Sequence, residues 1–295
     1  MTSVVAPPSR GTRAAARSGS QQSRGRSVSP WVYVAAVLVA VVTLAPVVYA
    51  VLSGFRSNGQ LGANPVGLPN PWVFDNYVGV LTSGSFWKYA VNSVIIALFT
   101  TALVVVCGVM AAYPLARYRF KGRQALFNVF VMGLMFPLTV AIIPLFLMVR
   151  QLGLMNTFAG VALPQAAFAL PMTIVILRPF LMSLPNELEE AAMLDGASRI
   201  GFFWRILVPL SGPGMVTTGV LAFVGSWNGY LLPLLFLNDP ALKTLPLGVA
   251  DFSTEHSADT AGVLAFTSLA VIPALVFFLT MQKRIVNGLQ GAVKG

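Results

Sequence analysis

The chain has 295 residues, of which 56% are hydrophobic and only 9% are charged, and its formal net charge is +10. Soluble domains usually carry about 25% charged residues, so this composition excludes a surface that mostly faces water and predicts an integral membrane protein. Cys107 is the only cysteine, which excludes a disulfide within the chain, and His256 is the only histidine, which gives no metal cluster. We expect no metal, no cofactor and no nucleic-acid partner.

The first 30 residues are rich in Ser, Arg, Ala and Pro and predict a disordered basic tail. An uncharged apolar run follows from Trp31 to Phe55. At ~1.5 Å per residue it is long enough to cross the ~30 Å hydrocarbon core with some tilt. Residues 48–50, VYA, resemble the cleavage site of a signal peptide. The run exceeds the roughly 7–15 apolar residues of such peptides, so we expect it to remain as the first span.

Continuous apolar runs predict membrane-spanning helices, because the strands of a barrel would alternate in polarity instead. Prolines inside the third and fourth runs predict kinks, which neighbouring helices can tolerate; they are Pro137, Pro144, Pro164 and Pro171. The expected fold class is all-α, a polytopic membrane bundle of six transmembrane helices. The six spans are expected at about 31–54, 88–116, 125–149, 158–182, 214–237 and 259–282.

The positive charges favour one side of this arrangement. Of the 19 Lys and Arg residues, 15 lie in the N-terminal tail, the 117–124 loop, the region of 178–205 or the C-terminus. The other four are Arg56, Lys88, Arg150 and Lys243. Because cytoplasmic loops are enriched in Lys and Arg, we expect a multi-pass protein of the cell membrane with both termini in the cytoplasm.

An acidic, alanine-bearing stretch, LPNELEEAAMLDG at 184–196, separates the fourth and fifth runs. It predicts a short helix with Pro185 at the first helical position, a capping arrangement of Asn186 with Glu189, and a stop at Gly196. Spacings of three, four and seven residues place four side chains on one helix face. They are Leu188, Ala191, Ala192 and Asp195.

Ser198 can cap a second helix, RIGFFWRILV, which is expected to end at Pro209. Two short helices joined by a sharp turn would make a compact knob on the cytoplasmic side. Small alanine side chains would let that knob sit close against a partner. The alternative is a connector that only lies on the membrane surface, and the residues alone do not decide between the two.

Residues 190–209, EAAMLDGASRIGFFWRILVP, resemble the EAA loop of binding-protein-dependent ABC importer permeases. Glu-Ala-Ala is followed by Gly196, nine further residues and Ile-Leu-Val-Pro, with Val208 where that family usually has leucine. The resemblance extends over about 72–295 and leaves the basic tail outside. The segments FDNYVGVL, GSWNGYLLPLLFL and QKRIVNGLQGAVKG are similar to the six-span second permease of carbohydrate importers of the maltose and glycerol-phosphate type.

This resemblance implies a six-span permease domain at 31–295 that contains a coupling loop at 183–213. It implies that five residues couple the permease to an ATP-binding subunit, namely Glu190, Ala191, Ala192, Asp195 and Gly196. The implied partners are a second permease, a homodimer of ATP-binding subunits, an extracytoplasmic solute-binding protein and membrane lipid, with carbohydrate as the substrate. Residues 291–295 would form a second contact with the ATP-binding pair or, alternatively, a solvated tail.

We do not expect the chain to be an enzyme, because it lacks the G-x-x-x-x-G-K-S/T motif that cradles ATP phosphates. Polar groups in mid-membrane are often functional. The expected substrate pathway lies on the fifth span, where an aromatic ring beside an amide suits sugars, and Asn92 on the second span is a further candidate. The pathway residues are Ser226, Trp227, Asn228 and Tyr230. The alternative is that they hold helices together.

Three other functions stay open at this point. Another branch of ABC importers would carry polyamines or amino acids, although the QKRIVNGLQGAVKG ending favours sugars. An ion-driven secondary transporter would need buried acids near span centres. A membrane enzyme would need a cluster of His, Cys or carboxylate groups near the interface.

Overall fold

The computed structural model describes residues 29–252 and 259–293, with side chains described as far as residue 282. The basic tail up to residue 28, His256 and the last two residues lie outside these ranges. The predictions about the tail and about a contact at 291–295 therefore stay predictions. Contacts divide the chain into two bodies, one up to Ala45 and one from Pro46 onward.

The described residues are all helix and loop, which confirms the predicted all-α class. The helices are α1 (Pro30–Gly54), α2 (Asn58–Ala63), α3 (Asp75–Thr82), α4 (Gly84–Arg117), α5 (Arg123–Gly133), α6 (Leu138–Gln151), α7 (Phe158–Met182), α8 (Glu187–Leu194), α9 (Arg199–Phe202), α10 (Val208–Leu210), α11 (Gly212–Trp227), α12 (Leu231–Phe236), α13 (Leu245–Gly248) and α14 (Thr260–Val293). A π-helical turn at Phe203–Leu207 joins α9 to α10, and short 3₁₀ turns cover Pro240–Leu242 and Val249–Phe252.

Four helices are long and apolar enough to cross a membrane, namely α1, α4, α7 and the Thr260–Gln282 part of α14. They correspond to the first, second, fourth and sixth predicted spans. Two further helix pairs are apolar enough to cross but are bent, Arg123–Gly133 with Leu138–Gln151 by 97° and Arg199–Leu210 with Gly212–Trp227 by 72°. The first pair covers the predicted third span, and the second covers only the beginning of the predicted fifth span. The described chain therefore has four single spans, or up to six if each bent pair crosses once.

The third predicted span, at 125–149, is not a single helix, and the kink predicted at Pro137 is a full break. Helices α5 and α6 meet at 97° across residues 134–137. At ~1.5 Å per residue they are only about 16 and 21 Å long. Pro137, extended at ψ 130°, immediately precedes the second of them. Proline lacks an amide hydrogen and disfavours helical backbone before it, which ends α5 here. Pro144 by contrast stays inside α6, and α7 stays continuous through its prolines.

The predicted fifth span at 214–237 is also interrupted. Helix α11 ends at Trp227 with a tightened turn, in which the Gly229 amide donates to the Ser226 carbonyl at 3.0 Å. Helix α12 begins only at Leu231. Pro233 has no amide hydrogen, so the series of backbone hydrogen bonds in α11 cannot continue through it. The three residues between the two helices leave the helical path close to the predicted substrate pathway.

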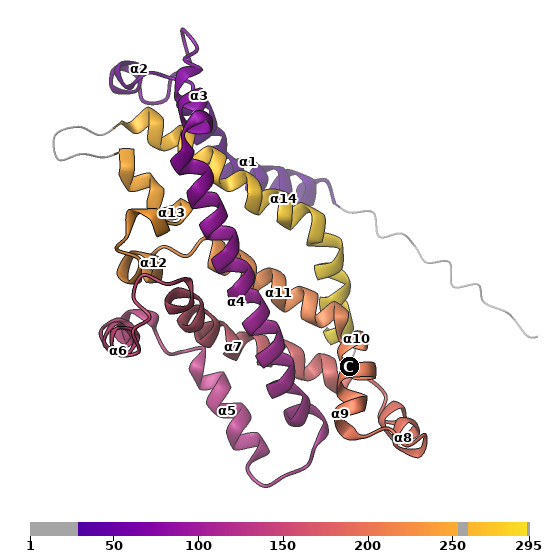
Figure 1. The fold of residues 1–295 in the computed structure, drawn as a ribbon. Helices are drawn as coiled ribbons and strands as arrows, with labels where there is room; N and C mark the ends of the chain where they lie inside the picture. Colours follow the sequence, from indigo (N-terminus) through magenta and orange to yellow (C-terminus); the bar gives the residue numbers. More distant parts are fainter. Residues whose placement is uncertain (1–28, 253–258, 294–295) are drawn as a thin grey trace, which may run out of the picture. The chain divides into compact units, whose positions relative to one another are not determined.

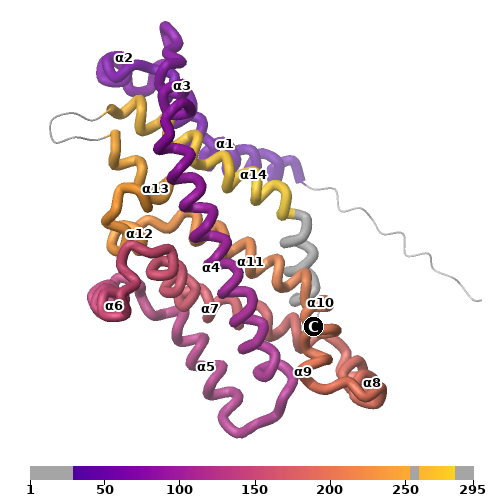
Figure 2. The backbone as a smooth tube through the Cα atoms, viewed as in Figure 1, coloured from indigo at the N-terminus to yellow at the C-terminus, as the bar shows by residue number. Residues whose placement is uncertain are grey.

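Helix α4 is the central element of the second body, and it packs on α7 and α11 along its length. Figures 1 and 2 show it running from α3 at one end to the neighbourhood of α8 and α9 at the other. Midway, Val104, Ala166 and Ala222 of the three helices form a buried contact. Small side chains let membrane helices approach closely, which gains packing that lipid cannot offer.

The end that carries α2 and α3 is organised around Arg56, which is only 2% exposed. Its guanidinium donates to the carbonyls of Pro65 at 3.0 Å, of Gln60 at 2.7 Å and of Asn64. The Asn76 amide donates to the carbonyls of Gly54 and Arg56, both at 2.9 Å. These bonds fold the loop after α1 back over the end of the bundle.

Candidate functional site

The 183–213 loop forms two short helices joined by a sharp turn, as the sequence predicts. Helix α8 ends at Leu194, and Gly196 follows its C-cap with a φ of +83°, which few other residues adopt readily. The Gly196 amide donates to the Met193 carbonyl at 3.1 Å, and the Ala197 amide donates to the Ala192 carbonyl at 2.9 Å. This pair of bonds is a Schellman motif. Ser198 then caps α9 by accepting from the Gly201 amide at 3.1 Å.

The predicted start of the first helix is wrong. Pro185 precedes the helix, which begins at Glu187, and the Asn186 side chain makes no capping bond. Asn186 instead accepts from Arg117, and the Glu189 carboxylate accepts from the Tyr113 hydroxyl at 3.1 Å. The side chains of Asn186 and Glu189, which a local cap would have used, therefore bond to residues at the end of α4 instead.

The second helix does not end at Pro209 as predicted but continues to Leu210. The π-helical turn at Phe203–Leu207 precedes the proline, and the Val208 amide donates to the Phe203 carbonyl. A proline ring ordinarily clashes with the carbonyl four residues earlier. The wider π turn makes room for that ring, and such turns are frequent at functional sites.

The two helices of the loop have a buried and an exposed face. Ala192, Phe202, Phe203 and Leu207 are buried against α4 and α7. Of the five predicted coupling residues, Glu190, Ala191, Asp195 and Gly196 are exposed and Ala192 is not. Of the four residues predicted to share one face of this helix, Ala192 is therefore buried while Ala191 beside it is exposed. Four exposed large apolar side chains between residues 187 and 207 form what we call the apolar patch, comprising Leu188, Leu194, Ile200 and Trp204.

Helix α8 is attached to the end of α4 by polar contacts. The Tyr113 hydroxyl lies 2.7 Å from that of Tyr118, as well as donating to Glu189. The Arg199 guanidinium lies 5.3 Å from the centre of the Tyr118 ring, a cation–π geometry. Because α4 is one continuous helix, these contacts join the loop mechanically to the middle of the bundle.

A cavity of about 350 Å³ lies between α4, α7 and α11. Its volume falls within the ~300–1,000 Å³ range of small-molecule sites. None of the described residues that line it is charged. They are Thr100, Leu138, Gln165, Phe168, Ala169, Leu221, Ala222, Gly225, Ser226, Gly229, Tyr230, Leu231 and Leu232.

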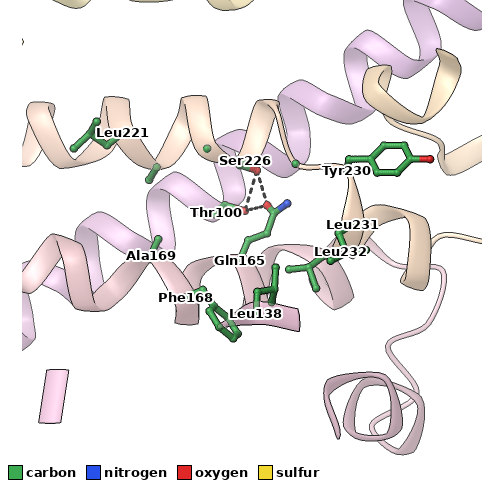
Figure 3. A pocket seen from close by; sticks show the side chains of 13 residues that line it. Thr100, Leu138, Gln165, Phe168, Ala169, Leu221, Ser226, Tyr230, Leu231 and Leu232 are labelled. Atoms are coloured by element: carbon green, nitrogen blue, oxygen red, sulfur yellow. Dashed lines mark hydrogen bonds between the residues drawn. The ribbon is translucent and has the colours of Figure 1, made fainter. Parts of the chain in front are cut away.

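Three polar side chains meet at this cavity, one from each of the three helices (Figure 3). The Ser226 hydroxyl donates to the Gln165 side-chain oxygen at 2.6 Å, and the Thr100 hydroxyl donates to the same atom at 3.0 Å. The two hydroxyl oxygens lie 3.4 Å apart. We call this group the polar triad. Gly229 keeps space beside it, because a Cβ there would lie 2.6 Å from the Gln165 amide nitrogen.

Residues 104–290 match the family of binding-protein-dependent transport system inner membrane components. The chain belongs to this family.

Similar proteins cover most of the chain. A diacetylchitobiose uptake system permease protein of Streptomyces coelicolor is 36% identical over 84% of this chain and 83% of its own length. A trehalose transport system permease protein of Mycobacterium tuberculosis is 40% identical over 77% of this chain and 84% of its own. A solved bacterial ABC transporter involved in the import of the acidic polysaccharide alginate matches with a TM-score of 0.74 and 25% identity, over 86% of this chain and 95% of that chain.

The protein is thus a multi-pass membrane permease of an ABC importer. It is a transport subunit and not an enzyme, because ATP hydrolysis in these importers lies in separate subunits. This agrees with the lack of a phosphate-binding motif in the sequence. Within the described residues, no group of His, Cys, Asp and Glu side chains could hold a metal ion.

The structure separates the four residues predicted for the substrate pathway. Ser226 and Tyr230 line the cavity of the polar triad. Trp227 and Asn228 line a second cavity, of about 490 Å³, on the α14 side of α11. The Trp227 indole donates to the Ala270 carbonyl at 3.3 Å. Consecutive helical residues point about 100° apart, so four neighbours cannot all face one cavity.

Asn92 anchors a loop at one end of the bundle. Its amide donates to the carbonyls of Ala241 at 3.0 Å and Lys243 at 2.9 Å.

Sequence reasoning missed Gln165 and Thr100. An uncharged amide inside the apolar fourth span was a signal, because polar side chains in membrane helices usually face the bundle interior or a cavity.

Proposed function

We propose that this permease moves a sugar or oligosaccharide into the cytoplasm, driven by ATP hydrolysis in partner subunits. The observation that carries the proposal is an uncharged polar cavity in the bundle, joined through α4 to an exposed loop at its end. The proposed partners are a second permease, a homodimer of ATP-binding subunits and an extracytoplasmic solute-binding protein. The family's dependence on a binding protein supports the last of these.

We assign the coupling to the 183–213 loop. Its exposed residues Glu190, Ala191, Asp195 and Gly196, together with the apolar patch, would contact the ATP-binding subunit. The exposure of Leu194 at 89% and Ile200 at 73% supports a protein contact, because such side chains gain free energy when a partner covers them. Ala192 would act from the inner face by letting α8 lie close to the bundle.

The uncharged cavity supports a saccharide over the polyamine and amino-acid alternatives. A polyamine would need carboxylates, and an amino acid would need partners for both of its charges. The names of the two relatives reported above, which give diacetylchitobiose and trehalose as substrates, also support a saccharide. An ion-driven transporter would need acids within the spans, and in the described residues all Asp and Glu lie outside the four long helices.

Purification of the tagged chain in mild detergent, with mass spectrometry of the retained proteins, tests the assembly. The expected retained proteins are an ATPase, a second permease and a solute-binding protein. The variants Glu190→Lys and Gly196→Pro are expected to lose the ATPase and retain the second permease, because they alter only the exposed face and the turn of the loop.

Asp75→Lys is the matched control, since it reverses an exposed acid at the other end of the bundle. It should retain the ATPase. Recovery of the chain alone, or equal retention of the ATPase by every variant, would contradict the proposed coupling.

A further inference from the structure

We propose that Gln165 donates a hydrogen bond from its side-chain amide to an oxygen of an uncharged saccharide that passes through the cavity. The inference rests on the proposed function and adds to it a specificity-determining residue and a substrate class. Gln165 lies on α7 and points between α4 and α11, where Figure 3 shows it beside Thr100 and Ser226.

The two hydroxyls fix the orientation of the amide. Both donate to its oxygen, at 2.6 and 3.0 Å, so the oxygen is held on the side of α4 and α11. The planar amide must then direct its nitrogen the other way, as the close-up shows. That nitrogen has no hydrogen-bond acceptor among the described residues. Its two hydrogens are therefore available to an acceptor that enters the cavity.

The backbone of the α11–α12 break leaves room next to this donor. Gly225 and Gly229 contribute no side chain, and a Cβ at Gly229 would collide with the amide nitrogen. Phe168 lines the same cavity and supplies an aromatic ring. A donor beside an aromatic ring fits a pyranose, which has oxygen acceptors at its edge and C–H groups on its face.

The cavity also restricts the charge of the substrate. Burying a carboxylate, sulfonate or ammonium group without an opposite charge is costly. The cavity walls, as far as the structure describes them, carry no such charge. The arrangement therefore favours a neutral saccharide over an acidic one.

A purely structural role is the competing explanation, because the triad also joins α4, α7 and α11. Two changes separate the roles. Gln165→Leu removes both the donor and the bonds between helices. The double variant Thr100→Val/Ser226→Ala removes the bonds between helices but keeps the amide donor. If Gln165 only joins helices, the two variants should be equally impaired.

The experiment measures uptake of radiolabelled trehalose, maltose, diacetylchitobiose and alginate tetrasaccharide by cells with and without this chain, normalised to the amount of assembled transporter. Uptake of at least one neutral probe should depend on the chain. For that probe, Gln165→Leu should reduce uptake about 5- to 10-fold, as expected for one lost hydrogen bond. The double variant should reduce it only about 2-fold. Gln151→Leu, an exposed glutamine at the end of α6, should leave it unchanged.

Equal losses in Gln165→Leu and the double variant would overturn the donor role, as would unchanged uptake by Gln165→Leu. Chain-dependent uptake of the alginate fragment alone would overturn the neutral substrate class while leaving the proposed function intact. If uptake of none of the probes depended on the chain, the result would contradict the proposed function and not the role of Gln165 in particular. Retention of the ATPase in every variant shows that the transporter has assembled.

Discussion

Arg56 and Gln165 show two ways in which an otherwise apolar chain holds a strongly polar side chain. Arg56 is buried and all its described partners are backbone carbonyls, so a loop closes around the cation. Gln165 has its oxygen satisfied by two hydroxyls and its nitrogen directed toward a cavity. In the first arrangement the partners of both terminal nitrogens lie within the chain, although the buried Nε has none among the described residues, and this indicates a structural role. The second leaves a donor to be satisfied from outside, which indicates binding.

The first prediction concerns Arg56. Its bonds leave from two different nitrogens toward separate carbonyls, which the single ammonium of lysine cannot reproduce. Arg56→Lys should lower the stability of the chain by about 2 kcal/mol. For a chain of this size we expect the melting temperature in detergent to fall by roughly 4–8 °C. Arg150→Lys, at an exposed arginine, is the control and should melt like the wild type. A wild-type melting temperature for Arg56→Lys would show that the loop does not depend on the guanidinium.

At the scale of elements, the contact between α8 and α4 decides how the loop can act on the bundle. The first helix of the loop is short and would be unstable alone. It is held by the hydroxyl of Tyr113, the side chain of Arg117 and the buried Ala192. A force on the exposed face of α8 would therefore reach α4 and, through it, the polar triad at Thr100.

The second prediction tests this link. Tyr113→Phe keeps the ring in the core but removes the hydroxyl bonds to Glu189 and Tyr118. We expect saccharide uptake per ATP hydrolysed to fall about 3- to 10-fold, the effect of one or two hydrogen bonds. The ATPase should remain bound, because the exposed face of the loop is unchanged. Tyr49→Phe, at an exposed tyrosine of α1, serves as control. An unchanged ratio of uptake to hydrolysis would show that α8 acts through another route.

At the scale of the whole molecule, the ends of the second body differ in character. One end carries α2, α3 and the loop around Arg56, and the other carries the 183–213 loop and the basic 117–124 segment. The uneven distribution of Lys and Arg predicts that the second of these ends is cytoplasmic. It follows that the solute-binding protein would dock at the first end and the ATP-binding subunits at the second.

The third prediction follows from this orientation. In a Cys107→Ala background, Val66→Cys should react with a membrane-impermeant maleimide in intact cells whose outer barrier admits the reagent. Lys121→Cys should react only after the membrane is permeabilised. Both native side chains are exposed, so a lack of reaction cannot be caused by burial of the introduced cysteine. The background chain without added cysteine should remain unlabelled. The reverse pattern of labelling would invert the proposed topology.

The sequence alone determined the class of this protein and much of its local structure. Continuous apolar runs require helices that satisfy their own backbone bonds in lipid, and four of the predicted spans appear as single helices. The stop at Gly196 and the cap at Ser198 were also predictable, because each depends on residues within one turn. The place of the 183–213 loop in the chain, and the permease family, were both predictable from the pattern of residues 190–209.

Only the tertiary structure decided what depends on residues far apart in the chain. Asn186 and Glu189 had the right spacing for a local cap, but a buried tyrosine and an arginine on α4 offered them stronger partners. The bend at Pro137 depended on which of two prolines in the same run would break the helix. The polar triad joins residues that are 65 and 61 positions apart, so no local period could place them together. Packing of α7 against α4 and α11 brought them to one cavity, because buried polar groups in a membrane must find partners on neighbouring helices.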